Sequence, residues 1–572
     1  MLEVVDRGGP ARTVRWTMGD SKKDLPNILF HHSTLFPAPP YAEMTAVRQE
    51  GRLDALLDGI PVFSIPEGIN PPLSFRRDEA EVQELPGTLM VHGRQDDLRS
   101  MEKEVFVLGN AFELRRDARA FVEAAVSLRE SIGYNRLIYA PGIMDPSNLA
   151  LLVYMGVDLV DSSLLIYQGS RGKALLTEGT LAAEEASWLV SPSGTAVRQN
   201  LDAAWKELQL VRHMLKVGRL RELVETRVHA TPWGVACLRI LDREHYGFQE
   251  KHWPVTGPPF YANTKMSLSR PDVLRYRKRI MERWRPAPHK KVLLLIPCSA
   301  KKPYYTSKSH RLFEEVLLSV PNSCAVQELI ITSPLGAVPR EIELFYPAAQ
   351  YDIPVTGHWD GEERAMVQEL VRHAAGFGFS TVINHLGVES EFVAEVVDAV
   401  ETAERSTTSK ESLDRLREAL VEACAKVEKA PRAQDRAESL RSAARFQFGA
   451  EGGALLDDAA VVGKYPFVKI MKGNTQLGML TPERGMISLT LEGAEALQGK
   501  AGWVEIGDFG LTGNLFAVGV KAADPGLRPG DEAIVIRNGE VEGVGVAVMS
   551  GEEMADSKRG EAVRIRHKRR RK

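Results

Sequence analysis

The chain has 572 residues, which at about 100–200 residues per domain predicts three to five domains. With 44% hydrophobic and 26% charged residues its composition is globular, which excludes wholesale disorder, a collagen-like fibre and a small disulfide scaffold. Four cysteines are too few for a disulfide framework and indicate a reducing compartment. The start of the chain lacks the pattern of a signal peptide, and no run approaches the roughly 18 uncharged apolar residues of a membrane span. We therefore expect a cytoplasmic protein with no membrane partner.

The charge is distributed unevenly along the chain. Seven of the last nine residues, 564–572, are Lys or Arg, so the rest of the chain carries −10 against −3 for the whole. An acidic body with a basic end is typical of local contact with a polyanion, and equally of a solvated, disordered tail. Both interpretations stay open on this feature. The candidate phosphate-binding residues are Arg564, Arg566, Lys568, Arg569, Arg570 and Arg571.

The first 255 residues mix short apolar runs with helical patterns. The runs 136–141 and 157–160 are predicted strands, and the polar stretch 145–148 predicts the start of a helix between them that reaches Tyr154. This order predicts a β-α-β unit with parallel strands. One long helical region is predicted from about 197 to 225, with its apolar positions in the core.

A shift to Pro and Arg between Gly257 and Lys291 indicates a domain boundary. Strand and helix patterns then alternate, which predicts a doubly wound parallel sheet. The predicted strands are Val292–Ile296, Leu329–Thr332, Tyr351–Thr356 and Thr381–His385, and the predicted helices are Arg311–Val320, Glu362–Ala375 and Phe392–Glu401.

The segment 402–450 is charged and Ala-rich, which predicts helix or linker, and Met486–Thr490 predicts a strand. From Gly502 onward, strand patterns and Gly-rich turns predict a small β-barrel. The predicted domains are therefore 1–255, 256–405, 406–497 and 498–572.

The stretch from Pro297 to His310 holds the densest chemistry in the sequence. It follows a predicted strand and precedes a helix that Ser309 could cap, which is where open α/β sheets bind ligands. It contains a thiol (Cys298), three lysines, two tyrosines, several hydroxyls and an imidazole (His310). A nearby lysine or helix N-terminus would lower the pKa of Cys298, and a histidine titrates near neutral pH.

Each of these features alone has an ordinary structural explanation, since a cysteine after a strand is usually a small buried hydrophobe. Their concentration in fourteen residues favours a site. Cys237, Cys324 and Cys424 have no such surroundings and are predicted to be structural. The sequence has no CxxC pair, no HExxH, no Walker loop and no GxGxxG opening a helix, so neither a metal site nor a cofactor is predicted.

The pattern Pro-Cys-x3-Lys-Pro-Tyr-x2-Ser-x2-His resembles the signature of the archaeosine synthase family, which is related to archaeal tRNA-guanine transglycosylases. The stretches Thr332–Arg340 and Tyr351–Asp360 are similar to that family as well. The residues that fill the pattern are Pro297, Cys298, Lys302, Pro303, Tyr304, Ser307 and His310. The resemblance implies an α/β multidomain fold: a transglycosylase-like (β/α) barrel-derived N-terminal domain, the central doubly wound domain and a small C-terminal β-barrel.

The two ends of the chain carry their own resemblances. Gly156–Asp161 matches a transglycosylase segment that holds a catalytic aspartate, which makes Asp161 a relic or secondary candidate. Two transglycosylase features are missing. The zinc cluster Cys-x-Cys-x-x-Cys is absent from the corresponding stretch near Trp188–Gly194, and the Pro-Thr-Arg that follows the aspartate in bacterial transglycosylases is absent, with Leu164–Ile166 nearby instead. At the other end, Trp503–His567 resembles a PUA domain, an RNA-binding pseudobarrel.

The resemblance implies an enzyme that converts the nitrile of 7-cyano-7-deazaguanine, at position 15 of tRNA, to an amidine (archaeosine) or an amine-donor adduct. Glutamine, ammonia and lysine are the candidate donors. We assign Cys298 as nucleophile, His310 as proton donor and Lys302 as the electrostatic group, with Tyr304 and Ser307 as further site residues.

Several alternatives stay open at this point. The donor amine could add directly to the nitrile, which would leave Cys298 a packing residue. The chain could instead be a tRNA-guanine(15) transglycosylase with Asp161 as nucleophile, or a non-catalytic tRNA-binding protein. Two further possibilities stay open: a partner enzyme could complete the reaction, and the chain could form a homodimer.

Overall fold

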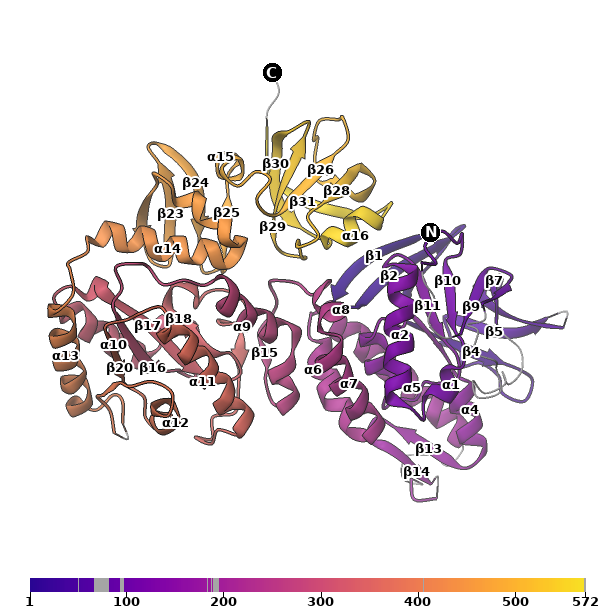
Figure 1. Ribbon diagram of the computed structural model, residues 1–572. Coiled ribbons are helices and arrows are strands. Elements are labelled where there is room, and N and C mark those ends of the chain that lie inside the picture. The colour runs from indigo at the N-terminus through magenta and orange to yellow at the C-terminus, as the bar shows by residue number, and fades with distance from the viewer. Residues whose placement is uncertain are drawn as a thin grey trace. The chain divides into compact units, whose positions relative to one another are not determined.

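The computed structural model describes residues 1–49, 51–65, 82–92, 97–182, 184–186, 188, 195–404 and 406–569. The chain forms two compact units, which we describe separately (Figure 1). Unit 1 comprises Met1–Pro254, Phe516–Val518 and Glu552–Glu561, and unit 2 comprises Val255–Leu515, Gly519–Gly551 and Ala562–Lys572. Within the described ranges, no helix is both long and apolar enough to cross a membrane.

Unit 1 is built around one large sheet. Over the described residues this sheet has nine strands, in the order β7-β6-β5-β4-β12-β11-β10-β9-β8. The run from β5 to β9 is parallel, and β6, β7 and β8 add antiparallel edges. The strands are β4 (Asn27–His32), β5 (Met44–Gln49), β6 (Arg52–Leu57), β7 (Ile60–Ile65), β8 (Val82–Leu85), β9 (Thr88–Val91), β10 (Val105–Leu108), β11 (Leu137–Ala140) and β12 (Leu159–Asp161).

The two ends of this sheet curl toward each other. The Ser64 amide in β7 donates to the Pro86 carbonyl at 2.8 Å, and the Thr88 hydroxyl in β9 donates to the Ser64 carbonyl at 3.1 Å. The buried side chains of Leu29, Val107 and other strand residues fill the core. The sheet is therefore barrel-like, as the sequence predicts.

Other elements surround this sheet in unit 1. Unit 1 also contains two smaller antiparallel sheets. One has the three strands β1 (Leu2–Gly8), β2 (Ala11–Met18) and β3 (Ser21–Leu25), and the other has the two strands β13 (Lys173–Leu176) and β14 (Gly179–Ala182). The helices are α1 (Ala111–Leu114), α2 (Ala118–Ile132), α3 (Leu149–Tyr154), α4 (Ser163–Ser170), α5 (Ala196–Lys216), α6 (Leu220–Arg227), α7 (Pro232–Glu244) and α8 (Tyr246–Glu250).

Two sequence predictions concern these helices. The predicted β-α-β unit is confirmed, because α3 lies between the parallel strands β11 and β12. The long helical region predicted from about 197 to 225 is confirmed, and the chain divides it into α5 and α6 with a break between them. Gly218 sits in that break at φ +72°, a left-handed conformation that ends a helix.

Unit 2 contains a second open sheet, with the order β18-β17-β16-β20-β21. Its strands are β16 (Val292–Pro297), β17 (Val326–Thr332), β18 (Gly336–Pro339), β20 (Thr381–Asn384) and β21 (Val400–Glu401). β16 is parallel to β17 on one side and to β20 on the other. The chain passes from β16 to β17 on one side and then crosses back to β20 on the other side of β16. Because such crossovers are right-handed, two that run in opposite directions place their helices on opposite faces of the sheet. The doubly wound prediction is therefore confirmed.

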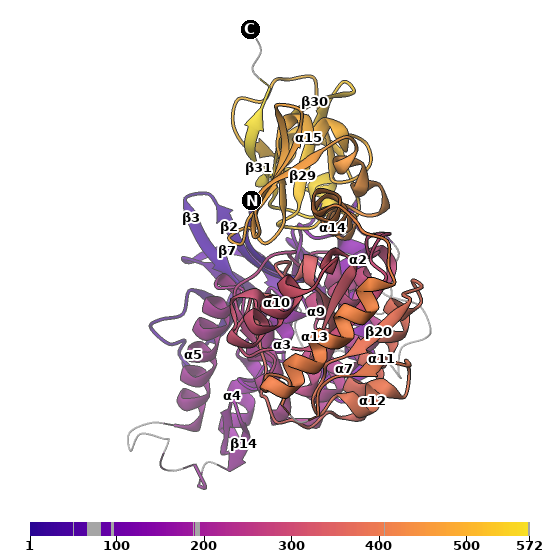
Figure 2. The same ribbon diagram turned by 90° about the vertical axis from the view of Figure 1, so that its left-hand side faces the viewer.

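The helices of the central sheet form two groups: in Figure 1, α10 and α13 lie to the left of its strands and α11 and α9 to their right, and Figure 2 shows the same helices from the side. α10 packs on α13, and α11 packs with α9 and β18. The helices are α9 (Pro271–Arg283), α10 (Lys308–Ser319), α11 (Gly361–Ala375), α12 (Ser390–Ala394), α13 (Lys410–Ala425) and α14 (Arg432–Phe448).

Two expectations for unit 2 need correction, and a third is decided between its alternatives. Of the predicted strand Tyr351–Thr356, only Tyr351–Asp352 (β19) is extended, and it pairs with β15 (Phe260–Tyr261) outside the main sheet; Pro354 lacks the amide that a longer ladder needs. The predicted helix Phe392–Glu401 is the short α12 followed by β21. The segment 402–450, predicted as helix or linker, is confirmed as helix, since α13 and α14 bury apolar side chains in the core of the unit.

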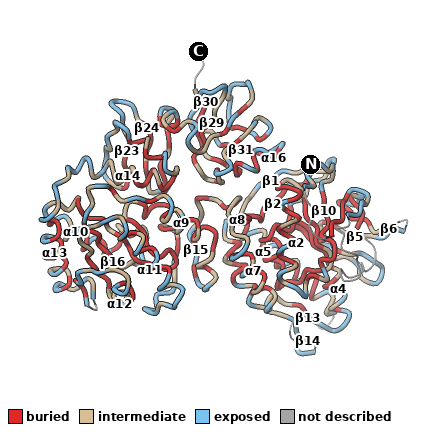
Figure 3. The backbone as a smooth tube through the Cα atoms, in the orientation of Figure 1, coloured by how far each residue is buried: buried red, intermediate tan, exposed pale blue. Residues whose placement is uncertain are grey.

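The last part of unit 2 is rich in antiparallel strands. A four-stranded sheet holds β22 (Ala460–Lys464), β23 (Phe467–Lys472), β24 (Thr475–Leu480) and β25 (Ile487–Leu489), the last of which confirms the predicted strand Met486–Thr490. After α15 (Leu491–Ala496), a six-stranded sheet holds β26 (Trp503–Ile506), β27 (Leu515–Phe516), β28 (Val520–Ala523), β29 (Glu532–Arg537), β30 (Glu540–Ala547) and β31 (Glu561–Lys568). The short α16 (Gly551–Asp556), which precedes β31 in the chain, belongs almost wholly to unit 1. Buried positions follow the central strands of each sheet (Figure 3).

Candidate functional site

The motif loop leaves the carboxyl end of β16, the middle strand of the open sheet. β16 is fixed by a run of five buried apolar residues, 292–296, and the Cys298 amide donates to the Ile331 carbonyl at 3.1 Å. The connections from β16 run first to β17 and later back to β20, so this strand end is the topological switch point, where such sheets bind ligands. The sequence prediction for the position of this loop is confirmed.

Ser307 begins α10. Its Oγ accepts a hydrogen bond from the His310 amide at 3.3 Å, and Ser307 itself is buried. The predicted cap was Ser309, two residues later, whereas the structure places Ser307 at the cap position. Because its hydroxyl is used to satisfy an otherwise unpaired helix amide, Ser307 orients the loop.

Buried hydroxyl groups form a chain beside Cys298. The Tyr304 and Tyr351 hydroxyl oxygens lie 2.5 Å apart, and the Thr332 hydroxyl at the end of β17 bonds to that of Tyr351. The Cys298 thiol in turn bonds to Thr332. Burial raises the pKa of both tyrosines, so both phenols stay protonated and can donate hydrogen bonds. The loop and two neighbouring segments thus place a thiol next to two neutral phenols.

Lys302 completes this cluster. Its Nζ lies 4.1 Å from the centroid of the Tyr351 ring and 6.0 Å from that of Tyr304, distances at which a cation is attracted to the ring face. Burial lowers the pKa of Lys302, while the charges of Cys298 and Asp352 oppose that shift. An amine with a lowered pKa beside a thiol can accept its proton.

The electrostatics of Cys298 differ from the sequence prediction. Burial raises the pKa of its thiol, the hydrogen bond from Thr332 and the charge of Lys302 lower it, and Glu389 raises it. The net shift is upward, so the predicted lowered pKa is wrong. Desolvation of the thiolate at the buried strand end outweighs the neighbouring positive charge. The thiol is therefore protonated near neutral pH and needs a base.

The surroundings of His310 argue against the acid–base role that the sequence predicts. Burial, and then the charge of Arg340, lower the pKa of His310 to about 2, and Arg340 Nη2 donates to its Nδ1 at 2.8 Å. The ring is 2% exposed and packs 5.3 Å from the Tyr304 ring and 5.5 Å from Phe313. A neutral imidazole that accepts from a guanidinium positions its neighbours and does not titrate near neutral pH.

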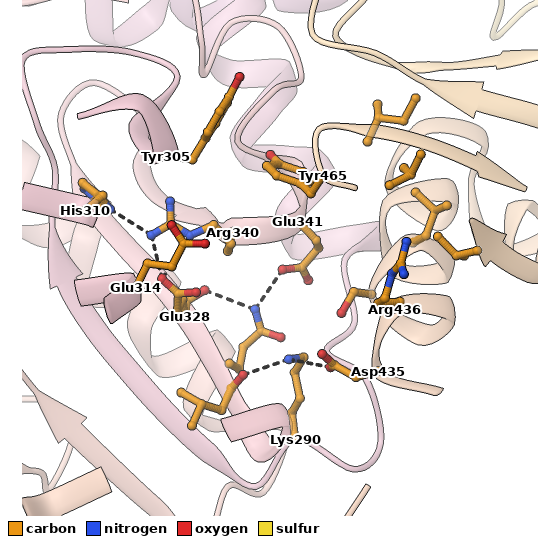
Figure 4. Close-up of a pocket in the computed structure, with 17 residues that line it drawn as sticks. Lys290, Tyr305, His310, Glu314, Glu328, Arg340, Glu341, Asp435, Arg436 and Tyr465 are labelled. Carbon is orange, nitrogen blue, oxygen red and sulfur yellow. Dashed lines mark hydrogen bonds and ion pairs between the residues drawn. The ribbon is translucent and has the colours of Figure 1, made fainter. Parts of the chain in front are cut away.

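A cavity of about 300 Å³ opens on the other side of His310 (Figure 4). Its charged groups are largely paired with one another: Arg340 with Glu328 at 2.6 Å, and Lys290 with Asp435 at 2.9 Å. Tyr305 and Tyr465 border it with rings 5.5 Å apart. His310 lines this cavity whereas Cys298 does not, so the cavity is a neighbour of the thiol cluster and not part of it.

Asp161 lies in unit 1, at the carboxyl end of β12, where barrel enzymes carry their active sites. Its Oδ2 accepts from the Tyr139 hydroxyl at 2.7 Å and the Gly142 amide at 3.0 Å. Its Oδ1 accepts from the Ser163 amide at 2.8 Å and the Ser163 hydroxyl at 2.5 Å, and His31 Nε2 lies 3.8 Å away. Four donors hold this carboxylate in place.

The basic C-terminus is a strand for most of its length. Residues 561–568 form β31, so the interpretation of 564–568 as a disordered tail is wrong. Arg566 donates to both carboxylate oxygens of the buried Glu532, Lys568 donates to the Thr512 carbonyl, and Arg569 pairs with Glu495 at 2.6 Å. These three side chains stabilise the fold of the C-terminal sheet, which weakens their assignment to phosphate. Arg564 is exposed on the same strand, and the predicted contacts of Arg570 and Arg571 lie outside the described residues.

Sequence reasoning missed three groups of this cluster: Thr332, Tyr351 and Glu389. Thr332 and Tyr351 each begin a stretch that resembles the family, which was a usable signal, but only the fold shows that both reach Cys298. Glu389 follows β20 and carried no signal. Across the ranges that the structure describes, no group of three His, Cys, Asp or Glu side chains could hold a metal ion.

Three family models match successive parts of the chain. A queuine tRNA-ribosyltransferase model matches residues 90–196, a domain of unknown function (DUF5591) matches 273–420, and a PUA domain model matches 508–569. The thiol cluster lies wholly inside the second match. A transglycosylase-like barrel, a central α/β domain that carries the motif loop and a PUA domain define the class of transglycosylase-related proteins with a C-terminal PUA domain.

Full-length relatives define the family within this class. The chain is 36% identical to archaeosine synthase subunit alpha of Methanosarcina acetivorans, over 94% of this chain and 87% of that protein. It is 33% identical to archaeosine synthase subunit alpha of Thermococcus kodakarensis, over 99% and 100%. A tRNA-guanine(15) transglycosylase of Methanothermobacter thermautotrophicus is 26% identical, over 78% and 68%. The chain belongs to the archaeosine synthase family.

Proposed function

We propose that this chain adds an amine to the nitrile of 7-cyano-7-deazaguanine at position 15 of tRNA, giving an amidine (archaeosine) or its amine-donor adduct. Family membership supports an enzyme that acts on tRNA in archaeosine formation. The single observation that carries the chemistry is the partly buried thiol of Cys298 beside Lys302 and the phenols of Tyr304 and Tyr351. A nitrile carbon is an electrophile, and a thiolate is the strongest nucleophile that this cluster contains.

The first step makes a covalent thioimidate. Lys302, whose pKa is lowered, takes the proton of the Cys298 thiol, and the sulfur attacks the nitrile carbon. A carbon–sulfur bond forms while one π bond of the nitrile breaks, and its electron pair goes to the nitrogen. The nitrogen then receives a proton from the Lys302 ammonium, while Tyr351 and Tyr304 donate hydrogen bonds to the developing charge. This role replaces the one that the sequence assigned to His310.

The second step transfers the carbon to the donor amine. The amine adds to the thioimidate carbon, the tetrahedral intermediate collapses, and the carbon–sulfur bond breaks. The donor nitrogen gives up one proton to Lys302, which passes it to the leaving thiolate, so the enzyme returns to its starting form. The net reaction is addition of an N–H bond across the nitrile, which needs no oxidant, reductant or cofactor.

The donor decides what must happen next. Ammonia, free or released from glutamine, would give the amidine directly, whereas lysine would give an adduct that a second enzyme must cleave. Two of the relatives are described as a subunit alpha, which supports a second component in those organisms. We propose that a partner of this kind completes the reaction when an amino acid is the donor.

Nucleoside mass spectrometry tests the proposal. Purified protein is incubated with nitrile-bearing tRNA and with ammonia, glutamine or lysine in separate reactions, and the tRNA is digested to nucleosides. The proposal predicts that the nitrile nucleoside gains the mass of ammonia when ammonia or glutamine is the donor, and the mass of one lysine when lysine is the donor. Exchange of free deazaguanine base into unmodified tRNA would favour the transglycosylase alternative, and tRNA binding without any mass change would favour a non-catalytic binder.

A further inference from the structure

The four-stranded sheet of unit 2 has one face in the core and one in solvent. Val468, Ile470 and Leu480 point inward and are at most 5% exposed. Side chains alternate along a strand, so their neighbours face outward. We define the outer face by the outward positions of β22, β23 and β24: Ala460, Val462, Lys464, Phe467, Lys469, Met471, Gln476 and Met479.

The outer face combines an exposed aromatic ring with basic side chains. Phe467 is 54% exposed and lies directly opposite Lys464 in the register, and Val462, which is 52% exposed, lies opposite Lys469. Both lysines are exposed, and neither makes a hydrogen bond or ion pair with a described residue. None of the outward positions of these three strands, all within the described chain, is acidic.

We propose that the outer face is a tRNA-contact surface, on which an unpaired base stacks on Phe467 and the adjacent phosphates bind Lys464 and Lys469. Exposed aromatic rings on a β-sheet, flanked by cations, are the features that bind splayed bases of single-stranded RNA segments. The charge of this face favours RNA as the occupant, because its two lysines, with no acidic side chain among the outward positions, complement the negative phosphate backbone.

This surface extends the proposed function, since it rests on tRNA as the substrate. The four-stranded sheet lies between the central sheet and the PUA-like sheet in sequence and belongs to unit 2, the unit that carries Cys298. A base held on Phe467 would help to keep a tRNA loop open while the modified nucleotide reaches the thiol cluster. The surface therefore contributes to affinity, and its loss should raise KM more than it lowers kcat.

Binding of nitrile-bearing tRNA to the full chain tests the surface, with affinity measured across a salt series. Phe467→Ala should weaken binding roughly 5- to 100-fold, as expected for loss of one stacked base, and should leave the salt slope unchanged. Phe467→Trp should retain affinity. Combined Lys464→Gln and Lys469→Gln should reduce the slope of log K against log salt by about 1.4–1.8, at 0.7–0.9 per phosphate contact.

Two exposed positions elsewhere in unit 2 serve as matched controls. Lys426→Gln on α13 removes a charge that is paired with Glu422, and Leu318→Ala on α10 removes a side chain that is 64% exposed. Both should leave affinity and slope unchanged. Because all the substituted side chains are exposed, unfolding midpoints should be unaffected, which separates lost binding from misfolding.

The outcomes are distinguishable. If every outer-face variant has the affinity and salt slope of the wild type, the proposal that this face contacts tRNA is wrong, while the proposed function is unaffected. Unchanged tRNA affinity together with lost binding to a protein partner would also overturn it, in favour of a protein interface. Failure of the wild-type chain to bind any tRNA would instead contradict the proposed function.

Discussion

Unit 1 and unit 2 each hold one candidate nucleophile at the end of a central parallel strand, and the two side chains differ in their hydrogen-bond partners. Asp161 follows β12 and accepts four hydrogen bonds, from the hydroxyls of Tyr139 and Ser163 and from two amides. Cys298 follows β16 and has one bond to Thr332 beside the Lys302 amine. The strand end gives both groups a location where ligands bind, whereas the neighbours decide reactivity. A carboxylate whose lone pairs are engaged is a poor nucleophile, and a thiol beside a base is a latent one.

Substitution of the nucleophile should have the largest effect. Cys298→Ser is nearly isosteric, but a serine hydroxyl is a far weaker nucleophile, so we expect kcat to fall at least about 1,000-fold. The unfolding midpoint should change little. Initial rates of amidine formation check this, and near-normal turnover with every donor would show that the donor amine attacks the nitrile directly.

Loss of the base should have the next largest effect. Lys302→Met should lower kcat about 100-fold, at the low end of general-base contributions. The positive charge of Lys302 lowers the pKa of Cys298, so its removal raises that pKa and shifts the alkaline rise of the rate to higher pH.

Lys302→Arg separates the two roles of this residue, since it keeps the charge but not the base. The rate of this variant should rise at the same pH as in the wild type, but the maximal rate should be lower. Full recovery of the rate would show that Lys302 acts by charge alone.

Substitution of His310 distinguishes a structural role of this residue from an acid–base role in the reaction. With its pKa near 2, His310 stays neutral in the folded state, while it takes up a proton in the unfolded state below pH about 6.5. Unfolding therefore becomes easier as pH falls through 6.5, by about 1.4 kcal/mol per pH unit, and this loss is absent above 6.5.

In His310→Gln the acid sensitivity should be smaller. Urea unfolding at pH 7 and pH 5 should show the wild type losing about 2 kcal/mol more than the variant. An equal loss in both proteins would mean that His310 is accessible and titrates normally, which would revive its acid–base role.

The smallest effect on catalysis is expected in unit 1. Asp161→Asn places an amide among four donors, so it should lower the free energy of unfolding by about 1–3 kcal/mol. Turnover per folded molecule should stay within about threefold of wild type. A loss of activity with retained tRNA binding would put Asp161 in the chemistry and favour the transglycosylase alternative.

Local patterns in the sequence were enough to predict the main features of the fold. The apolar run 292–296 predicts β16, and the alternation after it predicts the doubly wound sheet, because both follow from the periodicity of burial. The pattern did not show where a single residue interrupts an element. Gly218 splits a helix that its apolar spacing makes continuous, and Pro354 shortens the strand after Tyr351.

The candidate site was only partly predictable. Cys298, Lys302 and Tyr304 lie together as the motif predicts, because they share one short loop. The pKa of Cys298 could not be derived from composition, since it depends on how deeply the strand end is buried. The fate of His310 was hidden for a similar reason: Arg340 is thirty residues away, and only the fold places its guanidinium at Nδ1. Arg566 likewise looks free in the sequence, but it pairs with Glu532 across the sheet.

Trapping the thioimidate tests the central claim most directly. Wild-type protein is incubated with nitrile-bearing tRNA in the absence of any donor, digested with nuclease and protease, and analysed by mass spectrometry. The account predicts a peptide that contains Cys298 and carries the added mass of the intact nitrile nucleotide, lost on addition of the donor and absent in Cys298→Ser. Donor-dependent turnover by the wild type with no adduct at any stage, and with Cys298→Ser equally active, would contradict it.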